Sequence, residues 1–489
     1  QMGSAFLIVM FILTGVWGTD TQFSGINITV IVLALVGFGL KSGFLILHAW
    51  MPDTYPATPG PAAALMSSCM VNMGIFGLLK VIASTAGVTY FCGWAFLMIG
   101  IAGALIGVMY ALAQANIKRL LAYSSVENVG IICIGLGIGF LGSSQDNVTV
   151  AAFGFAGALL HILNHSLLKA VLFLCATTIQ QTKNTLDMDK LGGLLKQLPW
   201  TGSTFILSSL SISGLPPFNG FLSELLIYIA LLSGILSGGI LLIPSVGAAI
   251  ALALTGGLAA AAFVKASAFV FLGEPKAKSP AVCVTKNPMW TAIFPIISLF
   301  VLCVSVAVWA PVIVDGFSPI IANYTYIEPE DITSQMTAVS GILVRIGVVS
   351  CLLLVVFGAA SVFRSILPRG REEEISGTWD CGYAKPDSRM QYTGTSFVQP
   401  LSDFLNAVIM QKSTLKLPGG LFPKTGKHHI DIEAPDNAER LLWAPVFRLF
   451  ARISDKVHAI QSGYLHLYIM LMVAALVAAL LWAFVEMEI

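Results

Sequence analysis

The sequence has 489 residues, of which 56% are hydrophobic and only 10% are Asp, Glu, Lys or Arg. Because a soluble domain carries about 25% charged residues, this chain has too little charge to cover soluble domains with a hydrated surface, and it is predicted to be a membrane protein. A net charge of +1 without a basic cluster argues against nucleic acid as a partner.

The chain begins with Gln1 and lacks a basic segment before its first apolar run. We therefore expect the later part of a longer polypeptide, or a chain whose beginning is missing. Crossing a hydrocarbon core of about 30 Å takes roughly 20 helical residues, and eleven apolar runs approach or exceed that length, although the first is short. They predict an all-α, polytopic membrane helix bundle with spans near 2–17, 28–48, 62–83, 94–113, 118–141, 152–179, 203–233, 240–272, 290–314, 338–363 and 463–486.

Basic residues occur in only one of the two alternating sets of loops between these spans. The loops after the first, third, fifth, seventh and ninth spans together contain six acidic residues and no Lys or Arg. Since Lys and Arg accumulate on the cytoplasmic side, the chain is predicted to enter from that side and to end on the far side. The other loops contain or adjoin Lys118, Arg119, Lys183, Lys190, Lys196, Lys276, Lys278, Lys286, Arg364, Arg369 and Arg371.

Four charged residues stand out inside predicted spans, where an ionised side chain costs about 3 kcal/mol on insertion scales. Lys41 lies among the glycines of the second span, Lys118 at the start of the fifth, and Lys169 near the middle of the sixth. Glu224 follows a Pro-Pro pair that must interrupt the helix of the seventh span. These positions indicate a polar path through the bundle.

Some lysines within the predicted spans have a simpler explanation than a polar path. A long side chain near the end of a span can reach water, and we expect Lys80 and Lys265 to do so. Lys118 fits this explanation and a functional one equally well, whereas the other three in-span charges lie too deep for it. His161 and His165 share a helix face with Lys169, since steps of four residues stay on one side of a helix. The two histidines are equally compatible with a role in a proton relay and with being ordinary core residues whose hydrogen bonds are satisfied.

The two spans with breaks also suggest a transporter. They run in opposite directions by the loop-charge topology, and each carries a charge near its Gly-rich or Pro-rich interruption. This arrangement is typical of inverted repeats with discontinuous helices. It predicts two half-channels that open to opposite sides and are joined by ionisable groups at mid-depth.

The region after the tenth span has no long apolar run before residue 463. Within it, residues 434–461 place apolar side chains at near-helical spacing with Arg and Lys interleaved. This pattern predicts a lateral amphipathic helix on the membrane face or on neighbouring proteins, or an ordinary linker helix. We therefore divide the chain into a transmembrane bundle (1–363), a cytoplasmic-side segment with the lateral helix (364–462) and an anchoring transmembrane helix (463–489).

The cysteines indicate no redox centre in this chain. All eight are scattered, mostly within apolar runs, and none forms a CxxC pair. Iron–sulfur clusters and structural zinc sites need grouped cysteines, so we expect no metal, cofactor or disulfide framework here.

Four segments occur in an order that resembles the antiporter-like subunits of respiratory complex I, cation/proton antiporters and membrane-bound nickel-iron hydrogenases. They are KSGFLILHAWMPDTYPATPGPAAALMS, QANIKRLLAYSSVENVG, HILNHSLLKAVLFL and LPPFNGFLSE, within residues 30–230. The resemblance implies that Lys41 and Glu224 are the ionisable groups of the two discontinuous helices, and that Lys169 is the central connecting lysine. The predicted proton-translocation set is Lys41, Lys118, His161, His165, Lys169 and Glu224.

The sequence departs from the family pattern in two places. Asn72 and Ser67 occupy a stretch in which many relatives carry a second lysine or a histidine. Water or a neighbouring side chain would then have to connect Lys41 with Lys169. In the family, helices before the first lysine include one with a glutamate that pairs with it, and this sequence begins after them.

The segment GTWDCGYAKPDSRMQYTGTSFVQPL resembles the B-type subunits of hydrogenase-4 and formate hydrogenlyase. This implies a redox-silent subunit that translocates protons or sodium for a membrane-bound nickel-iron hydrogenase in a prokaryotic inner membrane. The implied partners are other membrane subunits, lipid and a peripheral redox arm with nickel-iron and iron–sulfur subunits. The alternatives are a subunit of a cation/proton antiporter or of a quinone-reducing complex I, and a scaffold whose lateral helix clamps its neighbours.

Overall fold

A computed structural model describes residues 2–17, 24–85, 89–275, 290–325, 327–367, 390–415, 430–458 and 465–487. This part of the chain divides into two units, Gln1–Pro435 and Asp436–Ile489, which are described separately. Several residues used above lie outside the described residues, as does most of the GTWDCGYAKPDSRMQYTGTSFVQPL segment. They are Lys276, Lys278, Cys283, Lys286, Arg369, Arg371 and Cys381.

The first unit consists almost entirely of helices, as the apolar runs predict. A short antiparallel hairpin, β1 (Lys412–Leu415) with β2 (Ile430–Glu433), is an exception and pairs Lys412 with Glu433. The helices of this unit are α1 (Met2–Trp17), α2 (Ser24–Ser42), α3 (Met51–Ala57), α4 (Gly60–Leu65), α5 (Val71–Ala83), α6 (Thr89–Ala113), α7 (Ile117–Ser144), α8 (Val148–Lys183), α9 (Pro199–Ile212), α10 (Asn219–Ser237), α11 (Leu242–Phe271), α12 (Trp290–Asp315), α13 (Ser318–Thr325), α14 (Pro329–Ile366), α15 (Gly394–Phe404) and α16 (Asn406–Ile409).

Each predicted span corresponds to a described helix or broken helix. In the described part of the chain, eight stretches are long and apolar enough to cross a membrane: Gly60–Ala83, Thr89–Ala113, Ile117–Ser144, Val148–Lys183, Asn219–Ser237, Gly239–Phe271, Trp290–Asp315 and Pro329–Ile366. Shorter apolar helices cover Met2–Gly15, Asn27–Ser42 and Tyr468–Trp482. The predicted all-α, polytopic fold is confirmed. The loop-charge orientation stays a prediction, since no membrane is present.

Both predicted helix interruptions are present. The first follows α2, where Gly43 has φ +71° and a run of turns leads to α3. The second separates α9 from α10, and Gly214 there has φ +65°. Such positive φ angles strain residues that carry a β-carbon, which explains the glycines at these positions. The second break also contains Pro216 and Pro217, which cannot continue a helical hydrogen-bond ladder.

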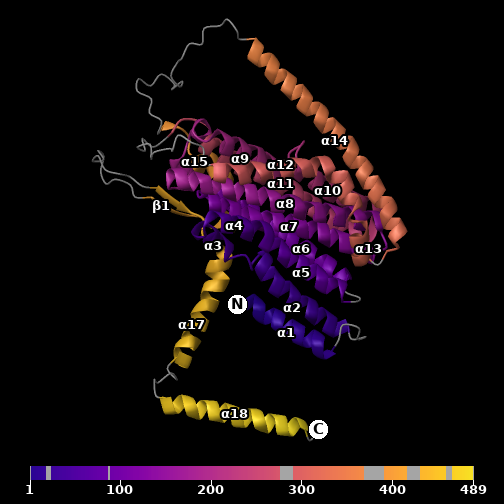
Figure 1. The fold of residues 1–489 in the computed structure, drawn as a ribbon, viewed down its shortest axis with the longest axis vertical. Helices are drawn as coiled ribbons and strands as arrows, with labels where there is room; N and C mark the ends of the chain where they lie inside the picture. The colour runs from indigo at the N-terminus through magenta and orange to yellow at the C-terminus, as the bar shows by residue number, and fades with distance from the viewer. Residues whose placement is uncertain are drawn as a thin grey trace, which may run out of the picture. The chain divides into compact units, whose positions relative to one another are not determined.

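Helix α7 lies at the centre of the bundle, between α6 and α8 (Figure 1). All of its span is buried inside the protein. Glycines allow α6 to approach it closely, since a β-carbon on Gly100 would lie 2.6 Å from the Ile134 nitrogen and one on Gly107 2.7 Å from the Glu127 nitrogen. Small residues at such contacts are the usual means of close helix packing in membranes.

Asparagine side chains cap the N-termini of the two central helices. The Asn116 side chain accepts hydrogen bonds from the Lys118 and Arg119 nitrogens at the start of α7, at 2.9 and 3.2 Å. The Asn147 side chain accepts one from the Val150 nitrogen at the start of α8, at 3.0 Å. These bonds satisfy backbone donors that a helix leaves free at its first turn, so both helices begin at defined residues.

The second unit contains a π-helical turn (Ala438–Trp443), α17 (Ala444–His458) and α18 (Leu465–Met487). Helix α17 is amphipathic: Phe450 and Ile453 alternate with Arg448 and Arg452 at helical spacing. The helical structure predicted for the stretch 434–461 is therefore present. Its location on a membrane face stays a prediction, as do the three predicted segment boundaries.

Candidate ion-translocation site

Lys169 is fully buried near the middle of α8, and its ammonium group contacts α7. Its Nζ donates hydrogen bonds to the Leu121 carbonyl at 3.0 Å and to the Ser124 hydroxyl at 2.8 Å. Both acceptors lie on α7, and its exposed fraction is 0%. This lysine is therefore held inside the protein, as the sequence predicted, and faces the central helix.

His161 lies two helical turns before Lys169 and connects α7 with α10. Its Nε2 is 3.2 Å from Asn128 Oδ1 on α7, and its Nδ1 is 3.0 Å from the Ser223 hydroxyl on α10. Asn128 in turn donates to the Ser124 carbonyl at 2.8 Å. A neutral imidazole has one donor and one acceptor nitrogen, so His161 is placed to pass a proton between the two helices.

Asparagines extend this polar row to the break between α9 and α10. Asn164 Nδ2 lies 3.1 Å from the Ser223 hydroxyl and 2.8 Å from the Asn219 carbonyl, and Asn219 Nδ2 donates to Asn164 Oδ1 at 2.9 Å. Ser211, at the end of α9, donates to Asn219 Oδ1 at 2.5 Å. The row therefore reaches the second discontinuous helix through neutral side chains.

Glu224 lies on α10 beside the break and is 7% exposed. A β-carbon on Gly214 would lie 2.8 Å from Glu224 Cδ, closer than real β-carbons approach other atoms. The absence of a side chain at Gly214 therefore leaves the space that the carboxyl group occupies. The break in the helix both bends the chain and makes room for its ionisable group.

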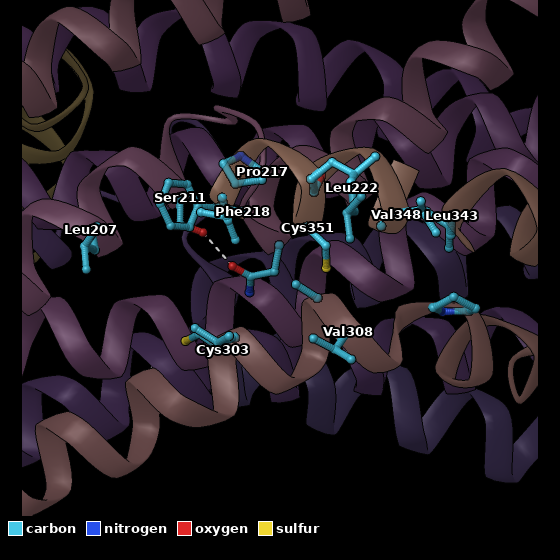
Figure 2. A pocket seen from close by; sticks show the side chains of 18 of the residues that line it. Leu207, Ser211, Pro217, Phe218, Leu222, Cys303, Val308, Leu343, Val348 and Cys351 are labelled. Carbon is cyan, nitrogen blue, oxygen red and sulfur yellow. Dashed lines mark hydrogen bonds between the residues drawn. The ribbon is translucent and has the colours of Figure 1, made fainter. Parts of the chain in front are cut away.

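An apolar cavity borders the other side of this break (Figure 2). Its volume is about 680 Å³, and its walls come from α8, α9, α10, α12 and α14. Figure 2 shows Ser211, Pro217 and Phe218 from the break facing Cys303 and Cys351. None of the lining residues is Asp, Glu, Lys, Arg or His, so the cavity adds no carboxyl, amine or imidazole group to the row.

His165, one helical turn before Lys169 on α8, contacts α5. Its Nδ1 is 3.4 Å from Asn72 Nδ2, which also lies 2.6 Å from the Ser166 hydroxyl and 2.8 Å from the Ser68 carbonyl. Within the described residues, His165 Nε2 has no hydrogen-bond partner. A π-helical turn, Met66–Met70, directly precedes α5, and such turns are frequent at functional sites. Asn72, the departure from the family pattern, therefore contacts the predicted site.

Lys41 is not brought into this row. It lies in the last turn of α2 with an exposed side chain, and no described residue forms a hydrogen bond or an ion pair with it. The Gly39 and Leu40 carbonyls beside it accept bonds from the Phe44 nitrogen and Trp50 Nε1, at 3.0 and 2.8 Å. The structure thus places Lys41 at the first break, as predicted, but on the surface of the described chain.

The three lysines with alternative explanations differ in their surroundings. Lys80 is exposed, consistent with a side chain that reaches water. The same expectation is wrong for Lys265, which is 1% exposed and donates to the Leu112 and Gln114 carbonyls at 2.5 and 2.7 Å. Lys118 is also buried and donates to the Thr58 carbonyl at 3.2 Å, outside the polar row. Lys265 is buried because the open carbonyls at the end of α6 replace water as its acceptors.

The sequence analysis missed a buried carboxyl group, Glu127, in the middle of α7. It is 1% exposed and interacts electrostatically with Lys169 and Glu224. A carboxyl group inside the apolar 118–141 run was itself a signal. The neutral members of the row were missed because no charge marks them: Ser124, Asn128, Asn164, Asn219 and Ser223.

Residues 4–251 match the protein family described as "NADH:quinone oxidoreductase/Mrp antiporter, TM". The chain is 34% identical to Hydrogenase-4 component B of Escherichia coli (strain K12), over 98% of this chain and 74% of that protein. The chain belongs to the NADH:quinone oxidoreductase/Mrp antiporter family. It is also 33% identical to Formate hydrogenlyase subunit 3 of the same organism, over 80% of this chain and 62% of that protein.

The fold has a counterpart among solved structures of this kind. The structure of the membrane-bound sulfane sulfur reductase, an archaeal respiratory membrane complex, contains a chain with a TM-score of 0.67 and 20% identity. The likeness covers 98% of this chain and 74% of that chain. The antiporter-like membrane fold predicted from the sequence is therefore confirmed.

Membership of the NADH:quinone oxidoreductase/Mrp antiporter family confirms the predicted identity of the chain as a multi-span membrane subunit of the ion-translocating, antiporter type. The similarity to the hydrogenase-4 and formate hydrogenlyase subunits confirms the predicted branch of the family. Both relatives are named as a component or a subunit, which supports the expected partner membrane subunits. The roles of the individual site residues stay predictions.

Proposed function

We propose that this chain is the proton-translocating membrane subunit of a membrane-bound nickel-iron hydrogenase complex in a prokaryotic inner membrane. One observation carries the proposal: a hydrogen-bonded row of buried polar side chains runs from the break beside Glu224 through His161 to Asn128, beside Ser124 and Lys169. The names of the two Escherichia coli relatives support the hydrogenase assignment.

The chemistry of the row favours protons over sodium. Lys169, His161 and Glu224 can each bind and release a proton, and hydroxyl groups such as that of Ser223 can both donate and accept. A path for sodium would be expected to present grouped oxygen ligands. Here the central amine and one of the two imidazoles each have a hydroxyl partner, Ser124 for Lys169 and Ser223 for His161.

The energy for translocation would come from partner subunits. We propose that a peripheral arm with nickel-iron and iron–sulfur subunits carries out the redox reaction, and that this chain holds no cofactor. The reaction would change the electrostatics or the conformation of the membrane part. The Lys41 side chain is exposed at the first break. A charged group from another subunit of the complex can therefore approach Lys41, and its movement would change the electrostatic balance of the proton path.

The test uses the assembled complex, reconstituted into liposomes that contain a pH-sensitive dye. Lys169→Met and Glu224→Gln should each lower redox-driven proton translocation by at least about tenfold, with redox turnover partly retained, because each removes a proton carrier. Lys80→Met is the matched control, since this lysine is exposed. Unchanged translocation in both site variants would refute the proposal, and absence of nickel from the purified complex would refute the hydrogenase assignment.

A cation/proton antiporter is the second candidate, because the family description itself includes the Mrp antiporter. In that case, a sodium gradient alone would drive proton movement in the same liposomes without any electron donor. Proton movement that requires a donor and is abolished by a protonophore, but not by a sodium ionophore, would favour the hydrogenase complex.

A further inference from the structure

Glu127 carries a carboxyl group in the middle of α7, a helix that is buried on all sides. Its residue is 1% exposed, and none of the described residues supplies a hydrogen bond to its Oε2. Holding such a group in the interior of a membrane protein is costly, and ionisable residues at this depth are kept mainly where they function. The carboxyl oxygen is therefore available as a proton acceptor.

The charges around Glu127 place it between the two ionisable groups of the proposed path. It interacts electrostatically with Lys169, of opposite sign, and with Glu224, of the same sign. Lys169 interacts electrostatically with Glu127 and also with His165 on its own helix. Lys169 and Glu224 therefore each have an electrostatic interaction with Glu127.

Ser124 provides the local connection. Its hydroxyl accepts the hydrogen bond from Lys169 Nζ at 2.8 Å, and it also hydrogen bonds the Glu127 side chain. Ser124 and Glu127 are three residues apart on α7, so they lie on one face of the helix. A hydroxyl that accepts from an amine and donates to a carboxylate can pass a proton between them.

We propose that Glu127 is a proton-carrying residue that connects Glu224 with Lys169 and serves as the countercharge of Lys169. This inference rests on the proposed function. In the first step, the protonated Glu224 carboxyl becomes a carboxylate as Glu127 accepts its proton. In the second step, Glu127 returns to the carboxylate and the neutral Lys169 amine becomes an ammonium ion.

The order of the steps follows from the charges. Two interacting carboxylates resist being ionised at once, so ionisation of Glu224 favours uptake of its proton by Glu127. Once Lys169 is protonated, the Glu127 carboxylate stabilises the ammonium ion, as does the bond to Ser124. His161 and His165 are the other ionisable groups beside this path: His165 interacts electrostatically with Lys169, and His161, bonded to Asn128 and Ser223, connects α10 with α7 by hydrogen bonds.

The experiment compares Glu127→Gln, Glu127→Asp and Glu330→Gln in the assembled complex reconstituted into liposomes. Glu330 is an exposed carboxyl in the first turn of α14 and receives the same chemical change. The readouts are the initial rate of proton translocation and the redox turnover with a protonophore present. Glu127→Gln should lower translocation at least about tenfold and leave uncoupled turnover within about a factor of two, while Glu330→Gln changes neither.

A second variant separates a relay role from a structural role. If Glu127 and Lys169 act in one path, the double variant Glu127→Gln/Lys169→Met should translocate no more slowly than Lys169→Met alone, because residues that act as a unit are not additive. Independent structural damage would instead multiply the two losses. Multiplied losses, or wild-type translocation by Glu127→Gln, would overturn the proposal.

Glu127→Asp decides the question if the Gln variant does not assemble. Asp keeps the carboxylate but shortens the side chain, so translocation should fall several-fold with normal uncoupled turnover. A wild-type rate in Glu127→Asp would then overturn the relay. A wild-type complex that translocates no ions at all would instead refute the proposed function, so the two failures are distinguishable.

Discussion

The space that Gly214 leaves for the Glu224 carboxyl can be tested by adding a single methyl group. In Gly214→Ala, the β-carbon would lie 2.8 Å from Glu224 Cδ and closer still to Glu224 Oε2, so the carboxyl group must move by roughly 0.7–1 Å to reach ordinary contact. Since a misplacement of about 1 Å at a reacting group can cost about 100-fold, we expect a loss of translocation of about tenfold.

Backbone strain alone must be separated from this effect. Alanine at the positive φ of Gly214 also costs about 1–2 kcal/mol. Gly239 is the matched control: its φ is +58°, and a β-carbon there would meet nothing within 4 Å. Gly239→Ala should therefore share most of the strain, seen as a lower thermal midpoint, and keep wild-type translocation in liposomes. Equal translocation rates in the two alanine variants would refute the steric argument.

Two further predictions concern stability, measured as the thermal midpoint of the purified complex in detergent. Lys265→Met should lower the free energy of unfolding by about 3 kcal/mol, because two charge-assisted hydrogen bonds to the end of α6 are lost; a midpoint equal to that of Lys80→Met would contradict this. Asp53→Asn removes the ion pair with Arg119 (2.8 Å), but both side chains are partly exposed, so it should cost less than about 1 kcal/mol. A larger loss would show that the pair stabilises the protein more than a surface pair should.

The sequence alone predicted the helices and their interruptions. The lengths of the apolar runs correspond to the helices because a span must satisfy its backbone hydrogen bonds internally. Glycines and prolines marked both breaks, since they open the helical ladder wherever they occur. The shared face of His161, His165 and Lys169 followed from their spacing along α8.

The tertiary structure decided which side chains meet. Helix α7 is buried on all sides, so no polar face along its sequence could indicate which of its residues contacts Lys169. The positions of Ser124 and Glu127 beside Lys169 depend on the rotation of α7 against α8, which close glycine contacts with α6 help to fix. The burial of Lys265 likewise depends on open carbonyls that a distant helix end provides. Local pattern fixes the length and the breaks of a membrane helix, whereas its neighbours fix the direction in which its side chains point.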